Sequence, residues 1–225
     1  MKLNKIVGLT VATLLAAVGV GLSTQTNASA KSYSGYSYAE TTRQIKSGKL
    51  RIPAKTRVYL FAPTTKNHKV YAKIDVGDLN YNIRHTSKNA EMIVPYSGNL
   101  KVLKGNYPRP VTIAKGKQFT TQSNFIKAPK IAITSNNYVE YFANGNTGTK
   151  PTSSTKITAT KQKGNLTHYY AKKNMLKLPD RHISKKGNYQ YRLAVRLNKN
   201  HFSKLSTSYS VGTLKNYFYL PAPMA

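Results

Sequence analysis

The sequence predicts an all-β protein made of two tandem small modules, each a β-sandwich or barrel-like unit. Three observations support this prediction: short segments in which apolar and polar residues alternate, frequent Gly, Asn, Pro and Lys turns between them, and landmarks that recur in the same order along the chain. We expect the modules at residues 48–127 and 128–225, after a signal peptide at 1–30 and a flexible Ser/Tyr-rich linker at 31–47.

The first thirty residues have the pattern of a secretory signal. Two lysines precede an uncharged apolar run at 6–22, and a polar stretch then ends in Ala-Ser-Ala at 28–30, a small-x-small cleavage pattern. The apolar run is short for a membrane span, and no later segment is apolar enough to form one. We therefore expect a secreted protein with no integral membrane span after cleavage.

The chain after the signal changes character near residue 49. Residues 31–38, KSYSGYSY, read as a flexible start, and residues 39–46 could form a short helix. From residue 49 onward the pattern is that of successive strands. In 69–76, Val, Ala, Ile and Val alternate with polar residues. In 188–197, Tyr, Leu and Val occupy every second position and leave the two arginines on the other face.

Recurring landmarks suggest an internal duplication with one copy in each module. The landmarks, first copy against second, are RVYLFA at 57–62 and NYVEYFA at 137–143, Gly-Asp-Leu at 77–79 and Gly-Asn-Leu at 164–166, KGNY at 104–107 and 186–189, and a following Phe119 and Phe202. Lys-Gly-Asn favours a turn without any ligand. The motif is therefore interpreted as a turn that begins a repeated strand, not as an active site.

Charge is the most informative property of the composition. Lys and Arg number 36 against 6 Asp and Glu, a net charge of +30, and cleavage at residue 30 would remove two lysines and leave +28. Self-repulsion on this scale disfavours the compact state, so we expect a polyanionic partner. A secreted protein meets the anionic polymers of a Gram-positive wall first, then lipid and nucleic acid. The chain has no Cys and hence no disulfides, which favours a bacterial product.

The sequence does not favour an enzyme. Asp75 and Asp78 are three residues apart, but they flank the end of a predicted strand and are better explained as turn formers than as a catalytic pair. None of the five histidines has metal-ligand spacing, and the chain has neither a thiol nor a Gly-x-Ser-x-Gly motif. Asp180 and His182 are close in sequence, but they follow a proline in a predicted turn. We predict no catalytic residue, no metal and no cofactor.

Basic residues interleaved with Tyr are what the chain offers for binding. Arg binds phosphate through two parallel hydrogen bonds, Lys acts as a point charge, and Tyr pairs an apolar ring with a hydroxyl. Any one of these residues could serve solubility alone, but together they favour a polyanion partner. The predicted polyanion-binding residues are Arg84, His85, Tyr170, Lys172, Lys173, Lys185, Lys186, Arg192, Arg196 and Lys199.

A family resemblance supports the same direction. NASAKSYSGYSY at 27–38 resembles the start of mature surface-layer and surface-layer-associated proteins of lactic acid bacteria. Residues 56–74 and 155–174 are similar in style to their wall-binding β repeats, which are Src-homology-3-like. The resemblance implies non-covalent wall binding. The attachment is expected to be non-covalent because the sequence has no Leu-Pro-x-Thr-Gly sorting motif. The resemblance does not imply lattice formation, because the sequence has no long Thr/Ala/Val-rich assembly region.

We therefore expect a secreted, non-enzymatic cell-surface protein that binds anionic wall polymers of the teichoic-acid type through a basic surface. Two alternatives of other classes stay open. A cell-envelope hydrolase or modifying enzyme would need two carboxylates facing one cleft. A protein that binds extracellular nucleic acid or anionic membrane would use the same charges, with Tyr rings stacking on bases, although no nucleic-acid motif is recognisable.

Overall fold

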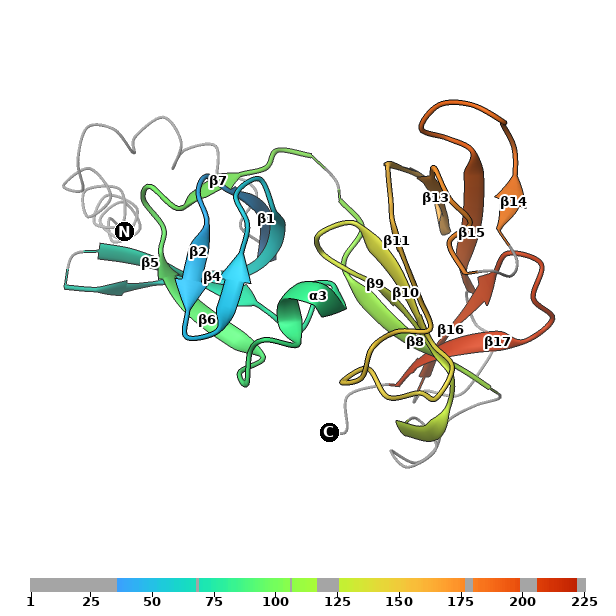
Figure 1. Cartoon of the computed structure of the whole chain (residues 1–225), viewed down its shortest axis with the longest axis horizontal. Coiled ribbons are helices and arrows are strands. Elements are labelled where there is room, and N and C mark those ends of the chain that lie inside the picture. Colours follow the sequence, from blue (N-terminus) through green and yellow to red (C-terminus); the bar gives the residue numbers. More distant parts are fainter. Residues whose placement is uncertain are drawn as a thin grey trace, which may run out of the picture.

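Figure 1 shows the computed structural model of the chain, which describes residues 36–67, 69–105, 107–116, 126–176, 180–198 and 206–221. The predicted signal peptide, the first part of the predicted linker, Phe119, Phe202 and Lys199 lie outside these residues. In the described part of the chain, no helix is long and apolar enough to cross a membrane.

The prediction of an all-β chain with two β units is confirmed. The first unit, residues 36–102, is a five-stranded antiparallel sheet in the order β6-β5-β4-β1-β7, accompanied by the β2-β3 hairpin. Its elements are β1 (Tyr36–Thr41), β2 (Ile45–Ser47), β3 (Leu50–Ile52), β4 (Arg57–Lys66), β5 (Lys69–Asp75), the one-turn helix α3 (Tyr81–Arg84), β6 (Glu91–Pro95) and β7 (Leu100–Val102).

The second unit, residues 111–221, is a curled ten-stranded sheet (Figure 1). Its order is β11-β10-β9-β8-β17-β16-β15-β13-β12, and β14 pairs with β15 beside this path. Its strands are β8 (Val111–Lys115), β9 (Lys130–Ile133), β10 (Tyr138–Phe142), β11 (Ser153–Lys156), β12 (Ala159–Lys163), β13 (Leu166–Ala171), β14 (Arg181–His182), β15 (Tyr191–Asn198), β16 (Ser206–Val211) and β17 (Tyr217–Pro221).

The described part of the predicted linker is strand, not linker or helix. β1 and β2 occupy residues 36–41 and 45–47, so the helix predicted at 39–46 is wrong. β1 lies between β4 and β7 and pairs with both, and Tyr38 and Ala39 are buried on its two faces. Strand partners far along the chain thus decide the structure of a segment whose local sequence carries little strand signal.

The boundary between the two sheets lies earlier in the chain than the predicted module boundary at residue 127. β8 precedes that boundary but pairs with β9 and β17 of the second sheet, so the division lies between β7 and β8. Both KGNY turns therefore precede strands of the same sheet, β8 and β15. Gly105 and Gly187 have positive φ, 129° and 83°, as expected for turns.

RVYLFA and NYVEYFA both lie mainly in strands, β4 and β10, but the Gly-Asp-Leu landmark and its counterpart fold differently. Gly-Asp-Leu at 77–79 leads into α3, whereas Gly-Asn-Leu at 164–166 leads into β13. Equivalent positions in a duplicated module would be expected to share their local structure. The described residues therefore do not support the proposed alignment of the two units.

Alternating burial explains why the strands form. In β5, Ala72 and Ile74 are fully buried, while Tyr71, Lys73 and Asp75, which alternate with them, are only half-buried. In β15, Leu193 and Val195 are buried and Arg196 is exposed. Such inward-facing residues build a separate apolar core in each unit. Tyr189, expected on the buried face of this segment, instead precedes β15 and is 47% exposed.

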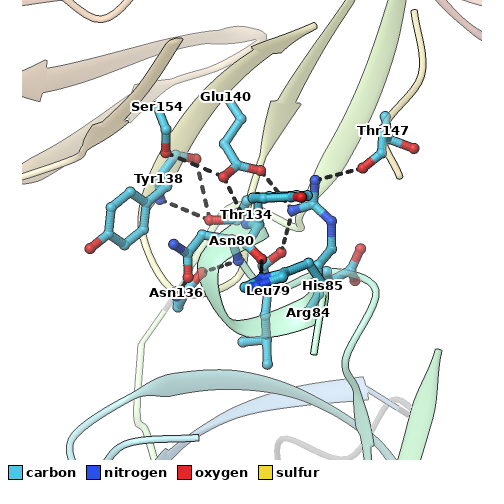
Figure 2. Close-up of polar contacts among 12 residues, drawn as sticks. Leu79, Asn80, Arg84, His85, Thr134, Asn136, Tyr138, Glu140, Thr147 and Ser154 are labelled. Atoms are coloured by element: carbon cyan, nitrogen blue, oxygen red, sulfur yellow. Dashed lines mark hydrogen bonds and ion pairs between the residues drawn. The ribbon is translucent and has the colours of Figure 1, made fainter. Parts of the chain in front are cut away.

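The two units are joined by a buried carboxylate. Glu140 of β10 is completely buried, and its Oε2 lies 2.6 Å from Nη1 of Arg84, at the end of α3 (Figure 2). Its Oε1 accepts hydrogen bonds from the Tyr81 backbone N–H at 2.8 Å and from the Ser154 hydroxyl at 3.2 Å. Glu140 of the second unit thus holds α3 of the first.

Arg84 is equally well satisfied. Its side chain is 13% exposed, and its guanidinium also donates to the carbonyl oxygens of Leu79, at 2.7 Å, and Thr147, at 3.0 Å. The guanidinium carbon lies 5.5 Å from the ring centroid of Phe142. Arg84 therefore bridges the two units through an ion pair and a carbonyl of the opposite unit.

The β9–β10 turn adds a second set of contacts between the units. Asn80 N–H donates to Asn136 Oδ1 at 2.9 Å, and Asn136 Nδ2 donates to Asn80 Oδ1 at 2.7 Å. The backbone N–H of Ser135 donates to the Asp78 carbonyl at 2.8 Å, and Arg57 Nε donates to the Ser135 carbonyl at 2.6 Å. These bonds make this part of the interface polar.

We predict that Arg84→Ala lowers the free energy of unfolding by about 3–5 kcal/mol, because it leaves the Glu140 carboxylate buried without its cation. The matched control is Lys73→Ala, which breaks the exposed pair with Glu91 and should cost at most about 1 kcal/mol. Urea unfolding monitored by Tyr fluorescence measures both changes. Equal losses in the two variants would show that the Arg84–Glu140 pair is not important for stability.

Candidate functional site

Strand register gathers basic side chains on one side of the second sheet. β12 and β13 pair Lys161 with His168, β13 and β15 pair Tyr170 with Arg192, and β14 pairs Arg181 with the same Arg192. Residues directly opposite each other in a sheet point to the same side. The basic face, as we call this surface, consists of Lys161, Lys163, His168, Tyr170, Arg181, Arg192 and Arg196.

The opposite side of the same strands is the core. Tyr169 and Leu193 are opposite each other and buried, as are Thr167 and Val195. On the basic face, Lys161, Lys163, Arg181 and Arg196 are exposed, and the other three residues are half-buried. Alternation along β12, β13 and β15 thus directs apolar residues inward and cations outward.

Aromatic rings lie among these cations. The Tyr170 ring centroid is 6.4 Å from that of His168 and 5.3 Å from that of Tyr189, and Lys161 Nζ lies 5.9 Å from the Tyr170 centroid. This arrangement gives the basic face an apolar area of rings in edge-to-face contact, and Lys161 lies beside it.

No carboxylate of the second unit offsets these charges. Its acidic residues are Glu140 and Asp180, and both are buried. Glu140 pairs with Arg84, and Asp180 accepts a hydrogen bond from the Met175 N–H at 2.7 Å. Like charges directly opposite, such as Arg181 and Arg192, destabilise a sheet. The basic face is therefore a surface that an anion would stabilise.

His168 responds to the surrounding charge. Burial, followed by the positive charges of Arg192 and Arg196, lowers the pKa of His168. Both arginines neighbour Ala194, the residue directly opposite His168, so they lie diagonally across the sheet from the imidazole. The two arginines act in the same direction as burial, since a nearby like charge disfavours the protonated imidazole.

Most of the predicted binding residues lie on this face or at its border. Tyr170, Arg192 and Arg196 belong to it, and Lys172 and Lys173 are exposed immediately after β13. Lys185 and Lys186 are exposed in the loop before β15. The hydroxyl of Thr158, immediately before β12, donates a hydrogen bond to the Asn188 carbonyl of this loop and so ties the loop to the edge of the sheet. The structure thus brings seven of the ten predicted residues into one region.

The other three predicted residues lie elsewhere or are not described. Arg84 is committed to Glu140 at the interface, so it is not an available cation, and the reason is a partner 56 residues away in sequence. His85 is exposed after α3, where its ring stacks on Tyr81 with centroids 4.8 Å apart. Lys199 lies outside the described residues.

Sequence reasoning missed Lys161, Lys163, His168 and Arg181 as members of this face. The signal for three of them was present: two alternating segments separated by Gly-Asn at 164–165 predict a two-residue hairpin. That hairpin fixes the register of Lys161 with His168 and places Lys163 on the same side. Arg181 had no such signal, because β14 has only two residues.

Asp75 and Asp78, the two acidic residues that are close in sequence, both have raised pKa values. Burial and the neighbouring Asp75 carboxylate raise the pKa of Asp78 to about 7, against the opposing charge of Arg84. Asp75 accepts a hydrogen bond from the Asp78 N–H at 3.2 Å, and burial raises its pKa too. The Asp78 carbonyl accepts a hydrogen bond from the Ser135 N–H of the second unit, so Asp75 and Asp78 belong to the interface. His182, the other residue considered for catalysis, packs its ring at a tilt against that of Tyr191, with the centroids 4.8 Å apart.

Among the described residues, no group of three or more His, Asp or Glu side chains could hold a metal ion. Comparisons with known proteins found no family model, no curated protein and no solved structure that matches this chain.

We predict that stability falls as pH rises from about 4 to 7, because the folded state holds a proton on Asp78 that the unfolded chain releases near pH 4. Above the folded pKa of about 7 this contribution is lost. Urea unfolding of the native chain and of Asp78→Asn, each across this pH range, isolates the effect. The variant should lack on the order of 1 kcal/mol of the pH dependence. Parallel curves for the two proteins would contradict this assignment.

Proposed function

We propose that this protein is a secreted, non-enzymatic binder of anionic cell-wall polymers of the teichoic-acid type, and that it binds them through the basic face. The observation that supports this most is the register that sets Lys161, Lys163, Arg181, Arg192 and Arg196 on one side of a sheet. No acidic side chain of the second unit is exposed beside them.

The dimensions of the face favour a polymer over a single ion. Arg192 and Arg196 are four residues apart on β15, so their Cα atoms are about 13 Å apart, and neighbouring strands are about 4.8 Å apart. Several phosphates of one flexible chain can contact such a surface at the same time, and each contact releases counterions. Binding of this kind depends on charge density and not on one precise ligand geometry.

The secreted location belongs to the same proposal. It rests on the signal pattern at 1–30 and on the resemblance of residues 27–38 to wall-associated surface proteins. The central ring area formed by Tyr170 and Tyr189 would contact the polyol or sugar portions of the polymer, since aromatic rings offer a flat apolar surface. Catalysis is not part of the proposal.

We predict that binding to teichoic-acid-bearing walls weakens steeply with salt. The double variant Lys161→Ala, Lys163→Ala should reduce the slope of log affinity against log salt concentration by roughly 1 to 1.5. This estimate uses the value of about 0.7 per phosphate for single-stranded nucleic acid. The matched control replaces Lys46 and Lys101, two exposed strand lysines of the first unit. That double variant should keep the native slope.

Walls stripped of teichoic acid provide the second arm of this experiment. Unchanged binding to stripped walls, or retention in molar chloride, would contradict the proposal. Equal loss in the two double variants would show that net charge, and not the basic face, is responsible. Competition at fixed salt between teichoic acid, DNA and anionic vesicles decides among the polyanions: stronger competition by DNA or vesicles would favour the alternative partner.

A further inference from the structure

A second candidate site lies between the two units. A pocket of about 280 Å³ is bordered by the start of β4, by the connection between the sheets and by the edge strand β12. Its polar and aromatic lining includes Arg57, Tyr107, Asn137, Thr158, Thr160 and Gln162. The pocket thus combines residues of both units with residues of the segment that connects them.

Arg57 is held in place at this pocket by two aromatic rings and one carbonyl. Its guanidinium carbon is 4.8 Å from the ring centroid of Tyr38 and 4.9 Å from that of Tyr107, and Nε donates to the Ser135 carbonyl at 2.6 Å. The Tyr38 hydroxyl donates to the Pro108 carbonyl at 2.8 Å, which fixes the connecting segment against the ring. The guanidinium therefore has a defined position before any ligand binds.

The charge of Arg57 is not neutralised within the described part of the chain. The ion pairs there are Lys73–Glu91 and Arg84–Glu140, and neither includes Arg57. Its terminal nitrogens Nη1 and Nη2 have no hydrogen-bond partner among the described residues, since only Nε donates. Burial lowers the pKa of Arg57, which is the expected result of desolvating a cation without a counter-ion. A half-buried guanidinium with two unused donor nitrogens is a group that an oxyanion would complete.

The remaining lining defines the rest of the ligand. Asn137 and Thr160 offer an amide and a hydroxyl, and Tyr107 offers a ring as a wall. The volume is slightly below the usual 300–1,000 Å³ of pockets for drug-sized molecules. A single sugar or polyol unit is of suitable size, and its hydroxyls would match the polar side chains of the rim.

We propose that this pocket binds a small hydroxylated oxyanion, a carboxylate or phosphate on one polyol or sugar unit, and that Arg57 is its anchoring residue. The site is separate from the basic face. Thr160 and Gln162 are opposite Tyr169 and Thr167, the inward-facing residues of β13, whereas Lys161 and Lys163 face the other side of β12. The proposal therefore does not depend on polymer binding at the basic face.

The test is an NMR titration of the ¹⁵N-labelled native chain with three related probes: glycerol 3-phosphate, glycerate and glycerol. We expect saturable shifts of the Arg57 Nε–H signal and of the amides at 157–160 with one or both anions, and none with neutral glycerol. The tighter of the two anions identifies phosphate or carboxylate as the preferred group. The absence of saturable shifts with both anions at millimolar concentrations would overturn the proposal, and so would equal shifts with glycerol.

Variants then assign the anchoring role. Arg57→Lys keeps the charge but loses the paired donors, so we expect the affinity to fall by about tenfold or more. Arg51→Lys, at an exposed arginine of β3, is the matched control and should bind as the native chain does. Lys161→Ala with Lys163→Ala should also bind normally, because those side chains face away from the pocket. Thr160→Val is a milder rim variant that tests the site if Arg57→Lys proves unstable. Native affinity in both Arg57→Lys and Thr160→Val would contradict the assignment.

Discussion

The ion pair between Arg84 and Glu140 is the interaction on which the arrangement of the two units depends. Removing both charges from water is costly, and the pair offsets this cost with the help of further hydrogen bonds to each partner. Glu140 accepts from the Tyr81 backbone and from Ser154, while Arg84 reaches the Leu79 and Thr147 carbonyls. A docking that kept Glu140 buried but moved Arg84 away would leave the carboxylate without its cation, which is strongly destabilising.

The same pair shapes the charge distribution of the molecule. With Glu140 used at the interface and Asp180 buried beside Met175, the second unit has no exposed acidic side chain to balance its lysines and arginines. Sheet pairing then concentrates several of these cations around Tyr170, where repulsion opposes folding and an anionic partner would relieve it. Because Glu140 serves the interface, its negative charge is not available at the surface. The polar interface and the unbalanced positive charge of the proposed binding surface are therefore connected.

Alternation and turn residues were sufficient to predict an all-β fold, because inward and outward positions repeat every two residues in β5 and β15. They also predicted that Arg192 and Arg196 share the outward face of one strand, whereas the pairing of Tyr170 with Arg192 came only from the structure. What local sequence could not predict depends on distant partners: β1 becomes a central strand through β4 and β7, β8 joins the second sheet, and Arg84 pairs with a carboxylate 56 residues away. The pocket at Arg57 could not be predicted from the sequence for the same reason, since its lining comes from three separate segments.

In our proposal, the basic face of the second unit, and not overall charge, recognises the polyanion. An NMR footprint of a short glycerol-phosphate oligomer on the full chain at physiological salt would test this. We expect the largest changes at the side-chain signals of Arg181, Arg192 and Arg196 and at the amides of β12 and β13, with the amides of Lys46 and Lys101 unchanged. Changes spread evenly over the exposed lysines of both units would contradict it.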